Sequence, residues 1–226
     1  MILEDDESPP LTLLPERVGL PRGRAALPES EVAASQRGRI LQAVTEEVAA
    51  RGYAATTVQH VSSRARVSRT AFYEHFEDKQ DAFTQAHREA SQQLLDLVRH
   101  QVAANADAPW RQRLQIGVEA YLVGFERAPA YAVSFAVELH AAGPRVLEQR
   151  DHFIEQHALH LRRLAGGARA EDPRVRRPSR LVAIGVVGAA DELAIRQIRA
   201  ARRGEPLNLD RLTRPIVTIY EAVLVR

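Results

Sequence analysis

The first helical pattern of hydrophobic and polar positions begins at about Ser35. Ile40, Val44 and Val48 recur four positions apart, which places their side chains on one face of a helix. Gly52 follows directly, where a glycine commonly ends a helix in a left-handed conformation. The pattern therefore predicts an amphipathic helix that starts near Ser35 and ends before Gly52.

Three further helices are predicted directly after this one. Thr56 and Gln59 match a capping box, in which the Thr56 hydroxyl accepts a hydrogen bond from a backbone N–H and Gln59 reaches back. We expect a short helix from there to about Ala65. Ser68 is a good N-cap for the next helix and Asp78 for the one after it. Two short helices therefore meet at a tight turn between Ala65 and Ser68.

Beyond Phe83 the hydrophobic pattern is helical almost throughout. No stretch alternates every two residues with the β-branched enrichment typical of strands, so no sheet is predicted. The predicted helices cover about residues 79–104, 109–127, 129–141, 144–166, 178–203 and 208–225. Residues 162–180 hold seven arginines and two prolines and are predicted to be an exposed loop. The sequence thus predicts an all-α fold.

Residues 1–34 differ from the rest of the chain because they show no apolar periodicity. They contain Pro9, Pro10, Pro15, Pro21 and Pro28. Proline fixes φ and lacks the backbone N–H that a helix interior needs. We therefore predict a flexible proline-containing arm over residues 1–34.

Charge and composition narrow the classes of function. The 226 residues include 31 basic and 29 acidic ones, and this net charge of +2 argues neither for nor against a nucleic-acid partner. The absence of cysteine excludes a disulfide framework, thiolate zinc sites and cysteine nucleophiles. The acidic start does not match a secretory signal, and the longest apolar run, Leu181 to Ala190, is too short to span a membrane. We expect a cytoplasmic protein without a membrane partner.

The segment from Arg37 to Phe83 carries the most specific signal. Three helices, a tight turn before the third and polar residues at its start match a helix-turn-helix. The segment resembles the TetR family of bacterial transcriptional regulators through Arg39-Ile40-Leu41, Gly52-Tyr53, Thr56-Thr57-Val58, Val67-Ser68-Arg69, Phe72-Tyr73-Glu74-His75-Phe76 and Asp78-Lys79. The resemblance implies a DNA-binding domain over residues 35–83 and a helical effector-binding and dimerisation domain over residues 84–226.

The resemblance also implies roles for single side chains of the helix-turn-helix. Arg69 and Thr70 would reach base edges from the start of the recognition helix, beside Ser68. Phosphate contacts would come from Thr57, Tyr73, His75 and Lys79. Arg66 stands where the family usually has glycine, and a left-handed conformation there would cost about 1 to 2 kcal/mol. We hypothesise that Arg66 is tolerated because it also meets the DNA backbone.

In the larger domain, most of the apolar and aromatic stripe is expected to be core. The resemblance implies an effector pocket among these helices, and the hypothesised pocket residues are Tyr121, Phe125, Phe135, His140 and Phe153. Apolar residues around most of the helix near 178–203 indicate burial on more than one side. Together with the last helix they look like the family's two-helix dimer face, formed by Leu181, Ile184, Val187, Leu193, Ile216, Tyr220 and Val223.

The sequence gives little support for a metal site or for an enzyme active site. His152, His157 and His160 invite a metal hypothesis, but their spacing does not place three ligands on one helix face, and neighbouring arginines oppose a cation. A Gly-rich phosphate loop, a nucleophile elbow and an H-E-x-x-H helix are all missing from the sequence. We predict no metal site, no cofactor and no catalytic residue.

The sequence therefore predicts a homodimeric regulator that binds a pseudo-palindromic operator in double-stranded DNA. By family tendency it would be a repressor, released from DNA by a small apolar effector. The alternative left open is a helical ligand-binding or structural dimer that has lost specific DNA binding. Arg66 in the turn is the local feature that supports this alternative.

Overall fold

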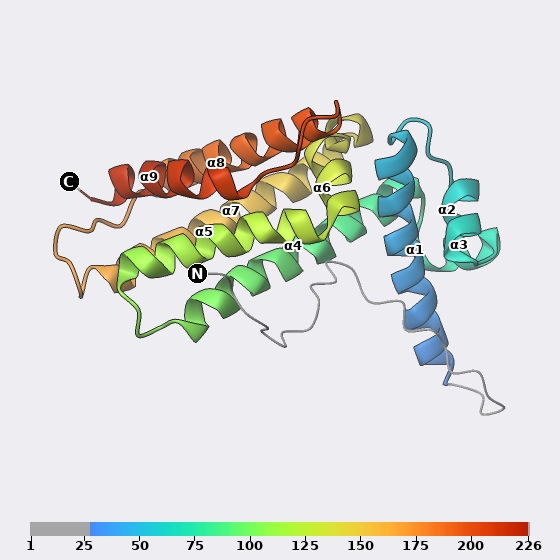
Figure 1. Ribbon diagram of the computed structural model, residues 1–226. Coiled ribbons are helices and arrows are strands. Elements are labelled where there is room, and N and C mark those ends of the chain that lie inside the picture. Colours follow the sequence, from blue (N-terminus) through green and yellow to red (C-terminus); the bar gives the residue numbers. More distant parts are fainter. Residues whose placement is uncertain (1–27, 226) are drawn as a thin grey trace.

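The computed structural model describes residues 28–225, and this part of the chain is almost entirely helical (Figure 1). It contains nine α-helices and two short 3₁₀ helices. Within the same residues no strand forms, although an isolated antiparallel bridge joins Val175 to Val225. The all-α fold predicted from the hydrophobic pattern is confirmed.

Three helices form a small unit at one end of the molecule (Figure 1). They are α1 (Glu29–Arg51), α2 (Val58–Ala65) and α3 (Arg69–His75). The unit has its own apolar centre, because the fully buried side chains of all three helices and of the residue that follows them meet there. These side chains include Ile40, Val44, Val61, Phe72 and Phe76.

The remaining helices build an elongated bundle. They are α4 (Lys79–Ala104), α5 (Trp110–Arg127), α6 (Pro129–Ala136), the 3₁₀ helix η1 (Leu139–Ala142), α7 (Pro144–Ala168), α8 (Arg180–Ala201), the 3₁₀ helix η2 (Asp210–Leu212) and α9 (Thr213–Leu224). The helices α4, α5, α7, α8 and α9 run along the bundle, while the short α6 lies at the end nearest α1 (Figure 1). The predicted domain boundary at residue 84 falls inside the continuous helix α4.

Capping side chains and prolines set where these helices begin. Asp78 accepts a hydrogen bond of 2.7 Å from a backbone N–H in the first turn of α4, and Ser179 does the same at 3.3 Å in α8. Pro129 and Pro144 stand at the first positions of α6 and α7, where a helix needs no N–H donor. The predicted starts of α4, α6 and α7 are therefore confirmed.

Side-chain contacts fix the three-helix unit on the bundle. Ser134 Oγ of α6 donates to the backbone oxygen of Thr45 in α1 at 2.7 Å, and both residues are buried. Glu138 accepts a hydrogen bond from the Tyr53 N–H at 3.2 Å and pairs with Arg202 after α8 at 2.8 Å. The unit is therefore held by polar contacts as well as by the continuous helix α4.

Some predicted boundaries are wrong. Helix α1 begins at Glu29, so residues 29–34 of the predicted arm are helical, while the part before residue 28 lies outside the described residues. Glu29 and Glu31 in the first turn favour this start because they complement the helix dipole. The prediction used only the spacing of apolar residues, so it did not include this effect. Helix α6 ends at Ala136, before the 3₁₀ turn of η1, and not at residue 141.

The arginine-rich segment is also more structured than predicted. Helix α7 continues through Gly166 and Gly167 to Ala168, because an exposed glycine inside a helix costs only about 1 kcal/mol. In the loop that follows, Val175 is fully buried and its neighbour Arg176 donates its backbone N–H to Leu224 at 2.7 Å. Residues 162–180 are thus partly helix and partly a loop anchored on α9.

Candidate functional site

Helix α3 combines one buried anchor with an exposed outer surface. Ser68 caps it by accepting a hydrogen bond from the Ala71 N–H at 3.0 Å, and Phe72 is fully buried beneath it. Arg69 and Thr70 in its first turn are exposed, and Tyr73 is 50% exposed. The polar side chains predicted to read DNA therefore stand on the solvent side of a helix held firmly from below.

The turn between α2 and α3 depends on a left-handed residue. Arg66 has φ 54° and ψ 49°, the conformation in which a glycine would be favoured. The chain reverses there through hydrogen bonds from the Val67 N–H to Ser62 and from the Arg66 N–H to Ser63. Arg39 donates to the backbone oxygens of Ala65 and Arg66 at 3.0 and 3.3 Å. The conformation anticipated from the sequence is confirmed, and the Arg66 side chain is exposed.

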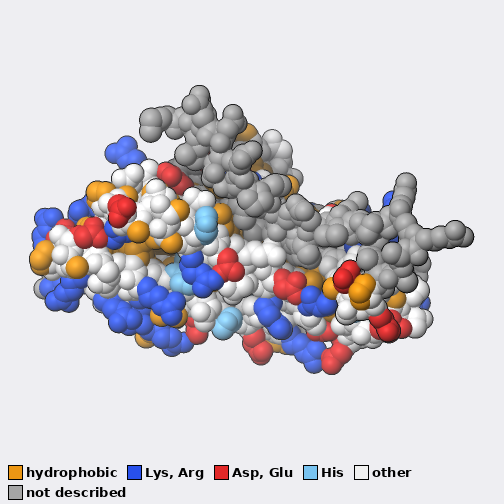
Figure 2. All heavy atoms as spheres, turned by 90° about the horizontal axis from the view of Figure 1, so that it is seen from below, with side chains coloured by type: hydrophobic (Ala, Val, Ile, Leu, Met, Phe, Trp, Pro, Cys, Tyr) orange, Lys and Arg blue, Asp and Glu red, His pale blue; other side chains and the backbone are white. Residues whose placement is uncertain are grey.

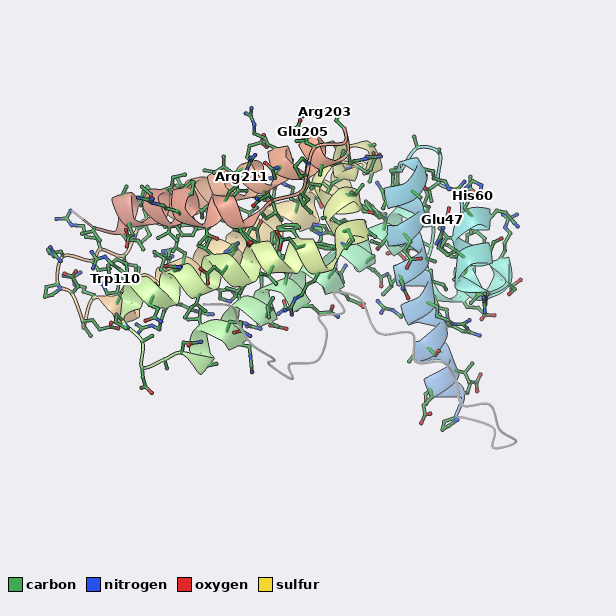
Figure 3. All side chains as sticks on the ribbon, in the orientation of Figure 1. Glu47, His60, Trp110, Arg203, Glu205 and Arg211 are labelled. Carbon is green, nitrogen blue, oxygen red and sulfur yellow. The ribbon has the colours of Figure 1, made fainter. Side chains whose placement is uncertain are left out.

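The start of α2 forms a capping box one residue later than predicted. Thr57 Oγ1 accepts from the His60 N–H at 3.2 Å, and His60 Nδ1 accepts from the Thr57 N–H at 3.3 Å. Thr56 instead donates its hydroxyl to the Gly52 backbone oxygen at 2.8 Å, and Gln59 has no capping role. Either of the two adjacent threonines could have been the N-cap, and the structure uses Thr57. His60, labelled in Figure 3, therefore takes the third helical position, where a capping box usually has glutamate or glutamine.

An ion-pair cluster joins α2 to α1. Glu47 of α1, labelled in Figure 3, is only 3% exposed and is contacted by Arg64 of α2 and by Arg51, each at 2.5 Å. Burial acts to raise the pKa of Glu47, but the hydrogen bond and charge of Arg64, aided by Arg51, lower it overall. The carboxylate is therefore ionised near neutral pH and holds α2 in place for the turn that follows.

Two predicted phosphate contacts have partners within the protein. Lys79 Nζ donates to the backbone oxygens of Tyr53 and Thr56, both at 2.7 Å, and lies 4.0 Å from the centre of the Tyr53 ring. Burial lowers the pKa of Lys79. His75 Nε2 lies 3.3 Å from Gln36 Oε1 and is half-buried. Thr57, by contrast, is exposed apart from its capping bond.

A cavity of about 320 Å³ lies in the bundle, toward the end away from α1–α3, where Trp110 is labelled in Figure 3. Its walls come from α4, α5, α7 and α9, and the lining is mostly apolar with none of the lining residues acidic. The lining residues are Val98, Arg99, Val102, Ala103, Arg113, Leu114, Gly117, Val118, Tyr121, His157, His160, Leu161, Arg163, Leu164, Gly167, Ile216 and Tyr220. The charged members are arginines, and Figure 2 shows many arginine side chains, in blue, at this end of the bundle.

Most of the predicted pocket residues lie elsewhere. Tyr121 does line this cavity, but Phe125, Phe135 and Phe153 surround a much smaller space of about 20 Å³ nearer the three-helix unit. They pack on other aromatic rings, with Phe135 stacked at 4.8 Å on Phe83. His140 is exposed on η1 and lines neither space. Phe125 and Phe135 therefore fill the core, while Phe153 also lines a separate space of about 360 Å³ between α4 and α7.

A buried polar cluster adjoins the inner end of the cavity. The Tyr121 hydroxyl donates to Asp191 of α8 at 2.9 Å, and Arg150 of α7 donates to the same carboxylate at 2.6 Å. Burial raises the pKa of Asp191, against the opposing effects of Arg150 and of the Tyr121 hydrogen bond. Burial and the Arg150 charge also lower the pKa of His87 to about 3. The wall of the cavity is thus tied to α7 and α8.

Sequence reasoning missed this cluster, although one signal was available. Asp191 stands directly after the run Leu181 to Ala190, where an acid requires a buried partner if that part of the helix is in the core. From the sequence, the histidines of α7 were considered only as possible metal ligands. His157 and His160 line the cavity, whereas His152 is exposed outside it. Among the described residues, no group of three or more His, Cys, Asp or Glu is placed to hold a metal ion.

The predicted dimer face is only partly available. Leu181 is 75% exposed, and Ile184, Leu193 and Val223 are half-buried. Val187, Ile216 and Tyr220 are buried within the single chain, so little of their surface is available to a partner, and their place in a dimer interface stays a prediction. Ile216 and Tyr220 line the cavity, because α9 packs on α5 as well as on α8. The adjacent Val182, 45% exposed, extends the outer apolar surface beside Leu181.

No helix among residues 28–225 combines the length and the apolar character needed to cross a membrane.

Comparisons with known proteins agree with this geometry. Residues 40–86 match the family described as bacterial regulatory proteins, tetR family. The HTH-type transcriptional activator FasR of Mycolicibacterium smegmatis is 33% identical over 86 residues, which span 38% of this chain and 38% of FasR. The chain therefore matches well under half the length of that relative.

Two solved structures share the fold over nearly their whole length. The fatty acid degradation regulator FadR of Bacillus halodurans has a TM-score of 0.70 at 16% identity, with 87% of this chain and 96% of that one covered. FadR of Bacillus subtilis in complex with stearoyl-CoA has a TM-score of 0.69 at 14% identity, covering 80% and 96%. The resemblance seen in the sequence is confirmed for residues 40–86, which match the tetR family of bacterial regulatory proteins, and the described chain shares the fold of these two solved structures.

Proposed function

We propose that the chain is a ligand-responsive DNA-binding regulator that acts as a dimer. The observation that carries this proposal is the presence, on one continuous helix, of both functional parts. Helix α4 follows α3 and packs at its N-terminal end on α1 of the three-helix unit, while its residues from Val98 to Ala103 line the cavity. A molecule in the cavity would therefore touch the same helix that holds α1 in place.

Arg69 and Thr70 would read base edges in the major groove. Both are exposed in the first turn of α3, and an arginine that contacts guanine through two hydrogen bonds contributes about 1 to 3 kcal/mol of discrimination. Thr57, Ser68 and Tyr73 are exposed beside them, as is Arg66, and would contact phosphates or set the position on DNA. Lys79 and His75 would add weaker phosphate contacts, since both already have partners.

The outer surface of α8 and α9 would form the dimer interface. Leu181 and Val182 are exposed apolar residues there, and Ile184, Leu193 and Val223 are partly accessible. A two-fold axis across this face would place two recognition helices roughly 34 to 36 Å apart, the spacing of successive major grooves. Such a dimer would bind a pseudo-palindromic operator.

The effector would combine an apolar body with an anionic group. The cavity has an apolar lining without acidic residues, and the charges of its wall come from Arg99, Arg113 and Arg163. Arg99 is paired with Asp96 and Arg113 with Glu171, so Arg163 is the arginine best placed for an anionic group. The stearoyl-CoA of the Bacillus subtilis FadR complex belongs to this chemical class. The effector predicted from the sequence was apolar, and the arginines are the reason for adding the charge.

The effector would act by shifting a population. It would bind more tightly to a form of the dimer whose recognition helices are wrongly spaced for DNA, so operator affinity would fall. We favour the repressor role predicted from the sequence. The relative FasR is named an activator, and the position of an operator relative to its promoter can give either outcome for the same DNA-binding step.

Fluorescence anisotropy on DNA that flanks the protein's own gene tests the proposal. Wild type should bind this duplex more tightly than a shuffled one, and Arg69→Ala should weaken binding by about tenfold or more. Arg127→Ala is the matched control, because it removes the same charge from an exposed position at the end of α5. The affinity should also fall with salt, with a log-log slope of about −0.9 per neutralised phosphate.

Equal, weak binding of both duplexes by all three proteins would contradict specific recognition of this DNA. A genomic selection for bound fragments would then decide between an operator elsewhere and the alternative of a dimer without specific DNA binding. Failure to enrich any sequence would establish the alternative.

A further inference from the structure

The cavity changes in polarity along helix α7. Its lining side chains Arg163, His160 and His157 follow one another at intervals of three residues, and they pass from exposed through half-buried to buried. Besides burial, the charges of Arg99 and Arg163 lower the pKa of His160, whereas the neighbour that lowers the pKa of His157 is His160. The arginines thus mark the outer rim of the cavity, and His157 marks its inner end.

The inner end holds a polar group that lacks a partner. His157 is only 7% exposed, and its Nδ1 atom is buried with no hydrogen-bond partner in the described part of the chain. Its ring lies 4.9 Å from the ring of Tyr121, whose hydroxyl is committed to Asp191. Tyr220 of α9, 3% exposed, completes this end of the lining. Nδ1 has almost no accessible surface, so a ligand group in the open space would pair through Nε2, the other ring nitrogen of His157, for which the described residues provide no hydrogen bond either.

The charge state of His157 limits which kinds of ligand group can pair with it. Burial, and then the neighbouring His160, lower the pKa of His157 to about 4, so the imidazole is neutral near pH 7. The groups that face it from other helices are Tyr121 of α5 and Tyr220 of α9, both uncharged, because burial holds each pKa above its usual value. A neutral imidazole has one N–H donor and one acceptor nitrogen, and it pairs well with an uncharged hydroxyl or carbonyl.

We propose that the molecule bound in this cavity carries an uncharged hydrogen-bonding group, a hydroxyl or a carbonyl, at its buried end, where it pairs with His157. This inference rests on the proposed function, in which the same cavity holds the effector with its anionic group at the arginine rim. A plain alkyl end would leave the imidazole unpaired in an apolar surrounding, which disfavours binding. The ligand is therefore polar at both ends and apolar between them.

Matched pairs of straight-chain acids test this directly. Octanoic, dodecanoic and hexadecanoic acids and their ω-hydroxy counterparts differ within each pair only by a hydroxyl at the far end. Isothermal titration calorimetry of the full chain should show, for the chain length that fits best, about tenfold tighter binding of the ω-hydroxy acid. His157→Phe, which keeps an aromatic ring but removes both nitrogens, should abolish or reverse this preference.

Two further variants separate recognition from packing. His157→Gln restores a donor and an acceptor and should recover a preference for the ω-hydroxy acid, and it serves as the test if His157→Phe fails to fold. His152→Phe makes the same substitution at an exposed position of α7 outside the cavity and should leave the preference unchanged.

Equal or weaker binding of the ω-hydroxy acid at every chain length would overturn the inference, as would a preference that survives His157→Phe. Failure of all six acids to bind would overturn it as well. The same titrations with operator DNA present separate this inference from the proposed function. If the ω-hydroxy preference is found but no acid changes DNA affinity, the regulatory proposal fails and the inference stands.

Discussion

The three-helix unit and the distal half of the bundle differ in how their interiors are filled. In the unit, Phe72 is fully buried and Ser68 and Thr57 are satisfied by capping bonds, although Arg39 Nε and Ser62 Oγ are buried without a hydrogen-bond partner among the described residues. In the bundle, a cavity of about 320 Å³ remains, with the buried His157 Nδ1 unpartnered beside it. Under the proposed function, the surface that contacts DNA needs a fixed shape, whereas the ligand site needs room.

The largest expected effect comes from removing a buried side chain of the three-helix unit. Phe72→Ala should lower the free energy of unfolding by about 3 to 5 kcal/mol, because it removes a fully buried ring and leaves a cavity under α3. Urea denaturation followed by circular dichroism measures the change. DNA binding should be lost with it, because Arg69 and Thr70 depend on the position of α3.

The neighbouring residue supplies the control. Tyr73→Ala removes a ring that is 50% exposed, and it should change the free energy of unfolding by about 0.5 kcal/mol or less. If the two substitutions cost the same, α3 is not anchored through Phe72.

The next largest effect concerns the bundle, where buried histidines should make the free energy of unfolding depend on pH. The pKa of His87 is lowered to about 3 and that of His157 to about 4, both mainly by burial, whereas in the unfolded chain each is near 6.5. Below pH 6.5 the unfolded chain therefore binds more protons than the folded one, so stability falls as the pH falls toward the folded-state pKa. Each histidine should cost about 2 kcal/mol between pH 7 and pH 5.

Urea denaturation at pH 7 and pH 5 measures this loss for wild type and for His157→Phe. The variant should lose about 2 kcal/mol less than wild type over the same interval. An identical pH dependence would mean that His157 becomes protonated in the folded protein through access to water.

The smallest expected effect concerns the strained turn. Arg66→Gly should raise the free energy of unfolding by about 1 kcal/mol, because glycine adopts the observed φ of 54° without steric cost. DNA affinity should fall at the same time if the exposed guanidinium contacts phosphate. Denaturation and anisotropy on one variant measure both effects, and a more stable protein with unchanged DNA affinity would disprove the phosphate contact.

Sequence reasoning was more successful in the first region than in the second. Ser68 and Asp78 were identified as caps, and the left-handed conformation considered for Arg66 is present, because each depends on neighbours a few residues away. Phe125 and Phe153 were assigned to the ligand pocket because they are aromatic, yet they fill the core. His157 was considered as a metal ligand, although its surroundings come from three other helices.

The sequence by itself determined the all-α fold, the caps Ser68 and Asp78, and the helix-turn-helix segment that matches the tetR family. These features follow from apolar spacing and from hydrogen bonds within one or two turns. The tertiary structure alone decided that Tyr220 lines a cavity, that Asp191 is paired with Arg150, and that His157 Nδ1 has no hydrogen-bond partner within residues 28–225. The physical reason is that each outcome depends on which helices meet around a side chain, and helical periodicity defines a buried face without specifying what covers it.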